Sequence, residues 1–419
     1  MNRLNADTNE NPLCRVLGAI GSALLCTCLF LSTAQADPRS SWAHGEGIHA
    51  LTQNLYLGAD IRRLLQPGDL SVNVALTYEI IEGTHFDERA KALARLIARE
   101  RPDVIGLQEV ALFKLIDPTT GQLKSETDYL EMLLKALQKQ GAHYKVAGDD
   151  ANPAISANQS ITLPRCLQTP PATDPSQPCA GPVDYLQYTD RDVMLIKARN
   201  RQAMVTDNTH FRFNLPLVVG GQNTEILRGY QIIEAKIGGI QYRIANTHLE
   251  VTGAEVGNPL ASFYQQAQAS ELIGVLNAKT TSLPLIMLGD LNSAADDTLA
   301  QEGPNRPYQQ FLSAGYVDTW AERRAPRNQF GNTCCRSETL SLLDDSPLTD
   351  RIDYVFARND LGARPDDLGP IFSRTLGSKP WSATRTGLWP SDHAGVSSTF
   401  RFNLTGDDHN HHDRGKKSH

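Results

Sequence analysis

The sequence has no excess of basic residues, no cysteine pairs with the spacing of a zinc site, and no internal repeats. Forty Lys and Arg face 47 Asp and Glu, for a net charge of −7. A broad electrostatic clamp for nucleic acid is therefore not supported, although a local basic groove stays open. No two cysteines have the C-x-x-C spacing, so a structural zinc site is not indicated.

What is present is ordinary for a large globular protein. Apolar residues make up 40% and charged residues 21% of the 419 residues, which excludes a largely disordered, collagen-like or polytopic membrane protein. A chain of this length can bury a sizeable core, either as one large α/β domain with insertions or as two or three smaller domains.

One uncharged apolar run, Leu17–Leu31, follows a basic residue and precedes the small-residue sequence Ala34-Gln-Ala36. A basic flank, a short apolar core and an A-x-A-like end predict a secretory signal peptide over residues 1–36, cleaved after its last alanine. The run is short for a membrane span, and an uncleaved anchor is the alternative. Residues 37–47 then form a linker, and we expect a secreted or periplasmic protein.

Cysteine usage agrees with export. Four cysteines remain after the signal peptide is removed, and an even number in an exported chain suggests disulfides. Cys166 and Cys179 lie in one Pro-rich stretch and are expected to pair locally. Cys334 and Cys335 are adjacent, so they either bridge each other or pair elsewhere, and the sequence does not decide between these pairings.

Apolar periodicity predicts strands interleaved with helices and one hairpin, which indicates an α/β or mixed architecture. The hairpin covers residues 230–245 and turns at Gly238-Gly239. Strands are expected at 48–57, 103–107, 192–196, 283–288, 352–356 and 395–402, and helices at 90–98, 130–137 and within 260–278. Polar, Pro-rich stretches near 148–188 and 322–349 read as loop insertions, and the His-rich tail 404–419 as disordered.

Polar residues with catalytic side chains stand at the ends of these apolar strands. Each one alone reads as a turn or cap residue. Together they indicate a site, because loops at strand ends build active sites. The residues are Asn54, Glu109, His248, Asp290, Asn292, Asp353, Asp392 and His393.

This ordered set resembles the endonuclease/exonuclease/phosphatase superfamily, the DNase I-like metal-dependent phosphoesterases, over about residues 48–403. The most specific segments are Gln108-Glu109, Gly289-Asp290-Leu291-Asn292 and Ser391-Asp392-His393. The resemblance implies an α/β (α+β) fold, a four-layer sandwich of two mixed β-sheets packed face to face with helices on the outside. It places the site at one edge of that sandwich.

The resemblance also implies a metal site. A phosphodiester is an anion, so its hydrolysis needs a hard cation that neutralises charge, and Mg²⁺ prefers oxygen ligands. Glu109 matches the principal Mg²⁺ ligand, with Mn²⁺ as a substitute metal. Asn54 matches a residue that contacts the metal or the phosphate, and Asp392 matches a carboxylate that faces the metal.

Further matches concern the movement of protons. Asp290 matches the carboxylate that orients or deprotonates the attacking water, and Asn292 a donor to the phosphoryl oxygens. Asp353 and His393 match a pair in which the carboxylate fixes the imidazole tautomer and raises its basicity.

His248 matches a second histidine that binds the phosphate or protonates the leaving group. Its own partner is not evident, although Asp190 and Asp192 lie on a plausible neighbouring strand. The segment Asn246-Thr-His-Leu249 argues against AP-endonuclease relatives. Secreted nucleases, sphingomyelinase or phospholipase C-like enzymes and inositol-phosphate phosphatases remain.

We therefore expect an exported Mg²⁺-dependent phosphodiesterase, with a phospholipid or small phosphodiester substrate slightly favoured by the negative net charge. It would act as a monomer that touches a membrane surface transiently. Trp381 and Trp389 flank the last motif and either touch substrate or pack its loop.

There are two alternatives to this function. An extracellular DNase-type endonuclease would need a basic groove. A catalytically inactive binding scaffold would show gaps in the catalytic set, and there are none. The residues available for a groove are Arg191, Lys197, Arg199, Arg201 and Arg212.

Overall fold

The computed structural model describes residues 47–402, apart from positions 170, 172, 201, 254–256, 279–282, 297–304, 325–329, 345 and 359–367. The predicted signal peptide, the linker up to residue 46 and the His-rich tail lie outside the described residues.

Within the described residues, nine strands form the first β-sheet, in the order β16-β17-β1-β2-β7-β3-β4, with β5 and β6 also paired to β7. The sheet is mixed, because β1 and β2 are parallel while the neighbouring pairs are antiparallel. The strands are β1 (Ile48–Asn54), β2 (Val104–Gln108), β3 (Leu112–Ile116), β4 (Leu123–Asp128), β5 (Tyr144–Val146), β6 (Ile155–Cys166), β7 (Val183–Lys197), β16 (Phe372–Leu376) and β17 (Gly395–Phe400).

A second mixed sheet has the order β14-β15-β13-β12-β11-β8, and a separate hairpin pairs β9 with β10. In the second sheet, β12 and β13 form the parallel pair, and β11 and β12 form the hairpin that the sequence predicted. The strands are β8 (Ala203–His210), β9 (Leu215–Val219), β10 (Gln222–Ile226), β11 (Gly229–Ile237), β12 (Ile240–His248), β13 (Leu285–Asp290), β14 (Val317–Asp318) and β15 (Asp353–Arg358).

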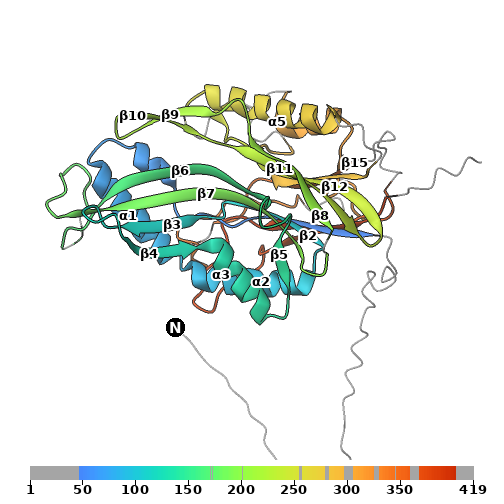
Figure 1. Ribbon diagram of the computed structural model, residues 1–419, viewed down its shortest axis with the longest axis horizontal. Helices are drawn as coiled ribbons and strands as arrows, with labels where there is room; N and C mark the ends of the chain where they lie inside the picture. The colour runs from blue at the N-terminus through green and yellow to red at the C-terminus, as the bar shows by residue number, and fades with distance from the viewer. Residues whose placement is uncertain are drawn as a thin grey trace, which may run out of the picture. The chain divides into compact units, whose positions relative to one another are not determined.

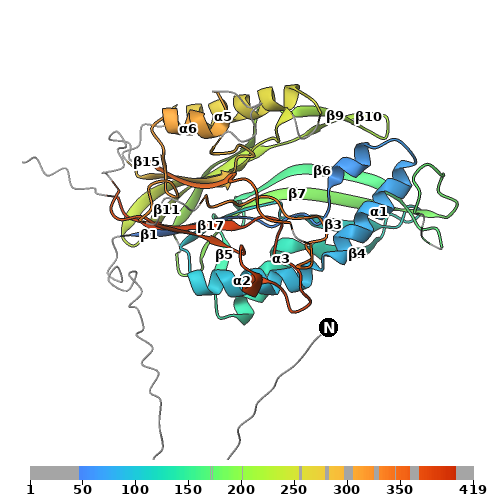
Figure 2. The ribbon, with the colours of Figure 1, turned by 180° about the vertical axis from the view of Figure 1, so that it is seen from behind.

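The two sheets pack face to face, and helices cover their outer faces (Figures 1 and 2). α2 and α3 lie against the first sheet, and α5 and α6 lie against the second. This is the four-layer α/β sandwich that the resemblance implied. The helices are α1 (Leu70–Gly83), α2 (Phe86–Glu100), α3 (Tyr129–Lys139), α5 (Leu260–Ala278) and α6 (Pro307–Ser313), with short 3₁₀ turns η2 (Ile61–Leu65) and η4 (Pro380–Ser382).

Local sequence explains the helices that position the first sheet. In α2, Ala90, Leu93 and Ile97 recur at helical spacing and are all buried. Asp69 and Asp128 begin α1 and α3, because each carboxylate accepts hydrogen bonds from two free backbone N–H groups of the first turn.

Apolar side chains form three main layers of core. One lies between the first sheet and its helices, a second between the two sheets, and a third between the second sheet and α5 and α6. In the middle layer, Ala50 of β1 and Met194 of β7 share a core with Ile244 of β12 and Leu288 of β13. Strands that lie between two layers of the core are buried on both faces, and their sequences are therefore continuous runs of apolar residues.

Residues 148–188, expected as a loop, form most of a long β-hairpin instead. β6 is rich in Gln, Ser, Thr and Asn, and the first half of β7 mixes apolar residues with Asp, Gln and Thr, which hides both from a search for apolar runs. Their pairing runs from Ile155 against Val193 to Cys166 against Val183. Cys166 is bonded to Cys179 at the end of this hairpin, with their Cα atoms 5.9 Å apart.

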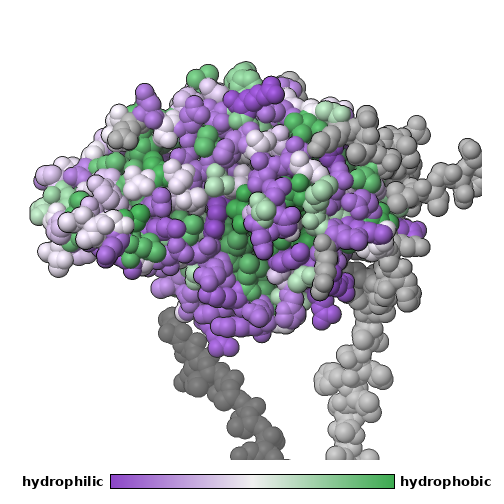
Figure 3. Space-filling view, viewed as in Figure 1, coloured by the Kyte–Doolittle hydropathy of each residue, from purple (hydrophilic) through white to green (hydrophobic). Residues whose placement is uncertain are grey.

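The surface gives no sign of a membrane-spanning helix in the part of the chain that the structure describes: no helix there is long and apolar enough to cross a bilayer. On the face drawn in Figure 3, hydrophobic residues lie in separate groups among hydrophilic ones.

Candidate active site

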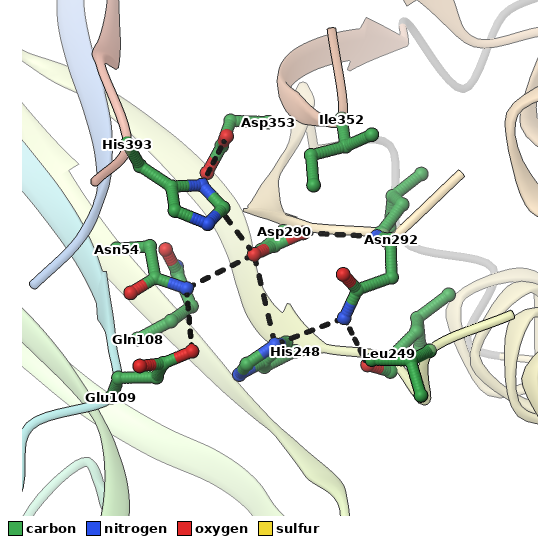
Figure 4. Close-up of polar contacts among 12 residues, drawn as sticks. Asn54, Gln108, Glu109, His248, Leu249, Asp290, Asn292, Ile352, Asp353 and His393 are labelled. Carbon is green, nitrogen blue, oxygen red and sulfur yellow. Dashed lines mark hydrogen bonds and ion pairs between the residues drawn. The ribbon is translucent and has the colours of Figure 1, made fainter. Parts of the chain in front are cut away.

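Strand register brings the predicted residues together at one edge of the sandwich. In the second sheet, His248 of β12 pairs with Asp290 of β13, which pairs with Asp353 of β15. In the first sheet, Asn54 of β1 pairs with Gln108 of β2. The two rows face each other, so carboxylates, amides and imidazoles from both sheets converge (Figure 4).

Glu109 and Asn54 form the side of the site that belongs to the first sheet. The Asn54 Nδ2 donates to Glu109 Oε1 at 3.1 Å and to Asp290 Oδ2 at 3.0 Å, while its Oδ1 accepts from the Tyr56 N–H at 2.8 Å. The Leu57 N–H donates to Glu109 Oε2 at 2.8 Å. Asn54 therefore presents its donor end to the carboxylates, and Glu109 is the group that offers oxygen ligands here.

Two residues at this edge of the sandwich have strained backbone conformations. Glu109 and Asn292 have φ angles of 53° and 47°, in the left-handed region that non-glycine residues rarely occupy. Such residues persist only where their surroundings hold them, and they cluster at functional sites. Here Gln265 of α5 donates to the Asn292 carbonyl at 2.6 Å and holds the turn after β13.

A second carboxylate, Asp392, faces the same corner. Burial raises the pKa of Asp392 to about 7, and the neighbouring Glu109 carboxylate adds to the rise. A carboxylate that is destabilised as an anion by burial and by a second carboxylate would be stabilised by a divalent cation, and both groups offer the oxygen ligands that a hard cation prefers. Glu109 and Asp392 are thus the residues that would hold a divalent metal ion.

Asp290 lies at the centre of the site. Besides the Asn54 amide, its Oδ2 has His248 Nε2 at 3.6 Å and His393 Nδ1 at 3.8 Å. Burial and the Asp353 carboxylate raise the pKa of Asp290 to about 7. A carboxyl group with a pKa near neutrality can take a proton from water, which agrees with the predicted role of Asp290.

His393 is paired with Asp353 across a 2.8 Å hydrogen bond between its Nδ1 and Oδ2. Burial alone would lower the pKa of His393, but the carboxylates of Asp353 and Asp392 outweigh it and hold the pKa well above its ordinary value. Asp290, Asp353 and His393 also bring three potential ligand atoms within 4.8 Å. Because the His393 Nδ1 already bonds to Asp353, this cluster suits proton transfer better than metal binding.

The partner of His248 is a residue that the sequence did not single out. Arg228 Nη1 lies 2.9 Å from His248 Nδ1, and Asp190 Oδ2 lies 3.8 Å from that same guanidinium. On the other side of the ring, Asn292 Nδ2 is 3.1 Å from His248 Nε2 and donates to the Leu249 carbonyl at 3.0 Å. The suggested orienter Asp190 therefore acts on the histidine only through Arg228.

Hairpin register only partly indicates Arg228. A two-residue turn at Gly238-Gly239 pairs Ile237 with Ile240 and Tyr230 with Thr247. Counting one step further sets His248 beside Gly229, so Arg228 is close in sequence to that position, but side-chain alternation would direct it to the other face of the sheet, and the contact is seen only in the structure.

A layer of amides joins the two sheets beneath the site. Gln108 Nε2 donates to Asn246 Oδ1 at 2.7 Å, and Asn246 Nδ2 donates to Gln231 Oε1 at 3.0 Å. Gly106 makes room for this contact, because a Cβ there would lie 2.3 Å from Asn246 Oδ1. The layer sets the distance between the two rows of catalytic side chains.

Loop residues frame the opposite rim. Trp389 is buried with Tyr56 and Leu340, and the Arg336 guanidinium stacks 3.4 Å from the Trp389 ring centre. Trp389 thus packs the loop that presents His393, whereas Trp381 is 65% exposed.

The adjacent cysteines lie on the same rim. Cys334 and Cys335 are bonded to each other, and the Cys335 Sγ lies 4.0 Å from His393 Nε2.

Among the residues suggested for a nucleic-acid groove, those that the structure describes are paired elsewhere or exposed. Arg191 donates to Asp128 at 2.6 Å and to the Val110 carbonyl at 2.9 Å, so it holds a structural position. Lys197 is paired with Asp103 at 2.7 Å. Arg199 is exposed, Arg212 is exposed and lies 3.9 Å from Glu271, and residue 201 lies outside the described residues.

Comparison with known proteins gives one family match. The model of the Endonuclease/Exonuclease/phosphatase family matches residues 52–393, which include every predicted catalytic and metal residue. No curated protein shows a significant sequence match.

Several solved structures are similar at low identity. Truncated TDP2 from Caenorhabditis elegans is 16% identical, with 85% of this chain and 97% of that chain covered and a TM-score of 0.43. A mannosyl-6-phosphatase of Bacteroides thetaiotaomicron VPI-5482 is 14% identical over 85% of this chain and 100% of that chain, with a TM-score of 0.47. A family protein from Leptotrichia buccalis C-1013-b is 17% identical with the same coverage and a TM-score of 0.46.

Proposed function

The chain belongs to the Endonuclease/Exonuclease/phosphatase family of phosphoesterases, and from this premise we propose that it hydrolyses a phosphodiester with the help of Mg²⁺, for which Mn²⁺ can substitute. One observation carries the proposal. The Asn54 amide joins Glu109 to the central Asp290 carboxylate, and His393, hydrogen-bonded to Asp353, lies 3.8 Å from the same carboxylate.

The chain's own residues supply the remaining chemistry. Asp290 positions water and accepts its proton, since its pKa of about 7 lets the carboxylate act as a base near neutral pH. The Asn54 amide donates to Asp290 and Glu109 and keeps the two carboxylates apart. Mg²⁺, when bound by Glu109 and Asp392, would neutralise phosphate charge.

For the substrate we propose a phospholipid or a small phosphodiester rather than DNA. The described basic residues of the suggested groove are exposed or paired with carboxylates away from the site. Phe213 and Phe263 are 43% and 57% exposed, with ring centres 6.2 Å apart. They are linked to the segment after His248, because Gln268 bonds both the Phe213 carbonyl and the Glu250 N–H. Exposed aromatic rings beside the site suit an apolar substrate portion and brief contact with a membrane surface.

We also propose that the protein acts outside the cytoplasm, after cleavage of residues 1–36. The signal-peptide pattern and the Cys166–Cys179 disulfide both support an oxidising compartment. Mass analysis of exported protein should find an N-terminus at Asp37 or within a few residues of it.

A substrate panel with the purified mature protein tests the reaction. The panel compares plasmid DNA, sphingomyelin, phosphatidylcholine, inositol phosphates, and nitrophenyl phosphodiester and phosphomonoester, each with Mg²⁺ and with excess chelator. We expect turnover of the diesters, its loss in chelator, and its return with Mg²⁺ or Mn²⁺.

Two variants localise the metal in that experiment. Glu109→Gln should lose most of the activity and its response to Mg²⁺. Glu131→Gln, an exposed α3 residue paired with Lys135, is the matched control and should behave as the parent protein. Full activity in excess chelator would contradict the proposed metal-dependent mechanism.

A further inference from the structure

Cys334 and Cys335, which we call the cysteine pair, bring sulfur to the rim of the active site. Their two Sγ atoms and a ring nitrogen of His393 lie within 4.8 Å of one another. Two thiolates and an imidazole are ligands that borderline and soft metal ions such as Zn²⁺ and Cd²⁺ prefer, whereas Mg²⁺ prefers oxygen. The two sulfurs are bonded to each other in the structure, so they become metal ligands only after reduction.

Two backbone hydrogen bonds hold the cysteine pair opposite the imidazole. The Ala394 N–H donates to the Thr333 carbonyl at 2.7 Å, and the Arg336 N–H donates to the Asp392 carbonyl at 3.1 Å. One bond lies on each side of the cysteine pair in the first segment, and one lies on each side of His393 in the second. The main chain therefore keeps the sulfurs beside the ring, whether or not they are bonded to each other.

His393 presents its Nε2 atom to the cysteine pair, with the Cys335 Sγ at 4.0 Å. Its Nδ1 is bonded to Asp353 Oδ2 at 2.8 Å (Figure 4). A metal-binding histidine almost always bonds through its second nitrogen in this way, because the partner fixes the ring and makes the free nitrogen a better ligand. Asp392 Oδ1 lies 4.0 Å from the same Nε2 and adds negative charge that favours a cation there.

Solvent can reach one member of the cysteine pair. Cys335 is exposed, whereas Cys334 is 4% exposed. Exposed disulfides are the more readily reduced ones, so a small thiol can attack the Cys335 sulfur. The other bridge, between Cys166 and Cys179, provides no ligand atom of this cluster and serves as an internal control.

We propose that Cys334, Cys335 and His393 form a metal site that is created by reduction of the cysteine pair and binds Zn²⁺. A dithiol reductant supplies two electrons and two protons, breaks the S–S bond and becomes a disulfide itself. The ion then binds two thiolates and Nε2, while the two thiol protons, with any proton on Nε2, pass to solvent water. The binding is independent of the proposed function, but its effect rests on it, since an ion on Nε2 stops His393 from transferring protons during hydrolysis.

Cd²⁺, a spectroscopic substitute for Zn²⁺, tests the binding without any substrate. The mature chain is reduced with a phosphine, because a dithiol would itself bind the metal. The phosphine becomes its oxide by taking an oxygen atom from water, and it is removed under nitrogen before the titration. We expect one Cd²⁺ per reduced chain, with ultraviolet thiolate-to-metal absorption, and no such absorption in the oxidised chain. A reduced chain without this absorption would overturn the proposal.

Matched variants assign the absorption to its ligands. Cys334→Ser/Cys335→Ser should lose it, whereas Cys166→Ser/Cys179→Ser should keep it. All the chains retain the His-rich tail, so any binding there cancels. If the first variant does not fold, Cys335→Ser replaces it and should lose about half of the absorption. Parental absorption in these rim variants would exclude the site.

The imidazole ligand is tested through the carboxylate behind it. Asp353→Asn should weaken Cd²⁺ binding to the reduced chain by about 10–100-fold, the usual effect of changing the partner of a metal-binding histidine. Asp87→Asn, on the exposed face of α2, is the control and should bind as the parent does. An unchanged affinity in Asp353→Asn would exclude His393 as a ligand.

Turnover of the nitrophenyl phosphodiester in Mg²⁺ measures the consequence. One equivalent of Zn²⁺ should inhibit the reduced parent, while the oxidised parent and reduced Cys334→Ser/Cys335→Ser each keep their own starting rate. Equal inhibition of all three would place the inhibitory ion at the Mg²⁺ ligands and contradict the proposed effect. Absence of turnover on every substrate of the panel would defeat the proposed function, while Cd²⁺ binding would still decide whether the metal site exists.

Discussion

At the scale of single residues, Asp353 acts through one contact. Its Oδ2 accepts from His393 Nδ1 at 2.8 Å, its side chain is fully buried, and its N–H is bonded to Thr333 Oγ1 at 3.2 Å. The carboxylate therefore fixes the tautomer of His393 and leaves Nε2 free for chemistry.

Asp353→Asn should lower kcat by about 10²–10⁴-fold, because an amide can donate to Nδ1 and reverse the tautomer. His393→Ala should lose a similar factor. The losses should not add in the double variant, since the two residues act as one unit. Steady-state rates of the four proteins measure this, with Asp87→Asn on the exposed face of α2 as control. Near-normal turnover of His393→Ala would mean that the assigned site is wrong.

At the scale of elements, Arg89 joins α2 to the loops that carry the site. It has no exposed surface, and it donates to the carbonyls of Leu55 at 2.7 Å, Tyr56 at 3.1 Å, Thr84 at 3.1 Å and Pro390 at 3.2 Å. The guanidinium thus connects the end of β1 with the segment before His393.

Arg89→Met should reduce the free energy of unfolding by about 3 kcal/mol or more, because it leaves buried carbonyls without donors. Urea unfolding followed by circular dichroism measures the loss. Arg95→Met is a suitable comparison, since Arg95 makes one bond, to the Ala383 carbonyl at 3.1 Å. Equal losses in the two variants would contradict a special role for Arg89.

Glu100 ties the end of α2 to the edge of the first sheet. Its carboxylate accepts from Ser397 Oγ at 3.0 Å, lies 3.5 Å from His49 Nε2 and pairs with Arg374 of β16. Burial would raise the pKa of Glu100, but the hydrogen bond to His49 and the Arg374 charge lower it to about 2.

A lowered carboxyl pKa stabilises the fold above the unfolded value, and this stability is lost as the pH falls toward the folded value. At pH 7, Glu100→Gln should therefore be less stable by about 2 kcal/mol, a figure reduced from the full shift because Arg374 is half exposed. The difference should shrink between about pH 4.5 and about 2. Thermal unfolding across this range measures it, and a difference that persists at the acid end would contradict the assignment.

At the scale of the whole molecule, the disulfide-bonded end of the β6–β7 hairpin and the active site depend on different contacts. The Cys166–Cys179 bridge closes a segment of 13 residues at the end of the hairpin. That segment also touches the start of α1, where Asp69 Oδ2 accepts from the Cys179 N–H at 3.0 Å. The catalytic rows lie on other strands and are held by the sheet register.

Replacing Cys166 and Cys179 by serine should reduce the free energy of unfolding by about 3 kcal/mol, the loop-closure effect of a segment of this length. Activity should be retained, because no catalytic residue lies in the hairpin's end. Hydrogen exchange should show lost protection over residues 167–182, with urea unfolding as the second measure. Loss of activity at full stability would show that this segment takes part in the site.

The class of protein and most of the residues that converge at the candidate site can be predicted from the sequence. Apolar runs of strand length that end in polar residues predicted β1, β2, β13 and β15, and the ordered residues from Asn54 to His393 predicted a phosphoesterase-like constellation. Such patterns are readable because burial on both faces forces apolar runs, and catalysis restricts residue types. The sequence did not predict the polar strand β6, because this strand is stabilised by its pairing with β7, and composition does not reveal pairing.

Which side chains of the site contact one another is visible only in the folded structure. Asp290 became the centre of the site because β13 lies between β12 and β15 and packs against β1 of the other sheet. Arg228, in the segment just before β11, is the group that contacts His248, and the suggested Asp190 contacts Arg228 instead. The charge state of each imidazole depends on a neighbour from a distant segment, and electrostatic interactions of this kind are set by distance and burial rather than by sequence spacing.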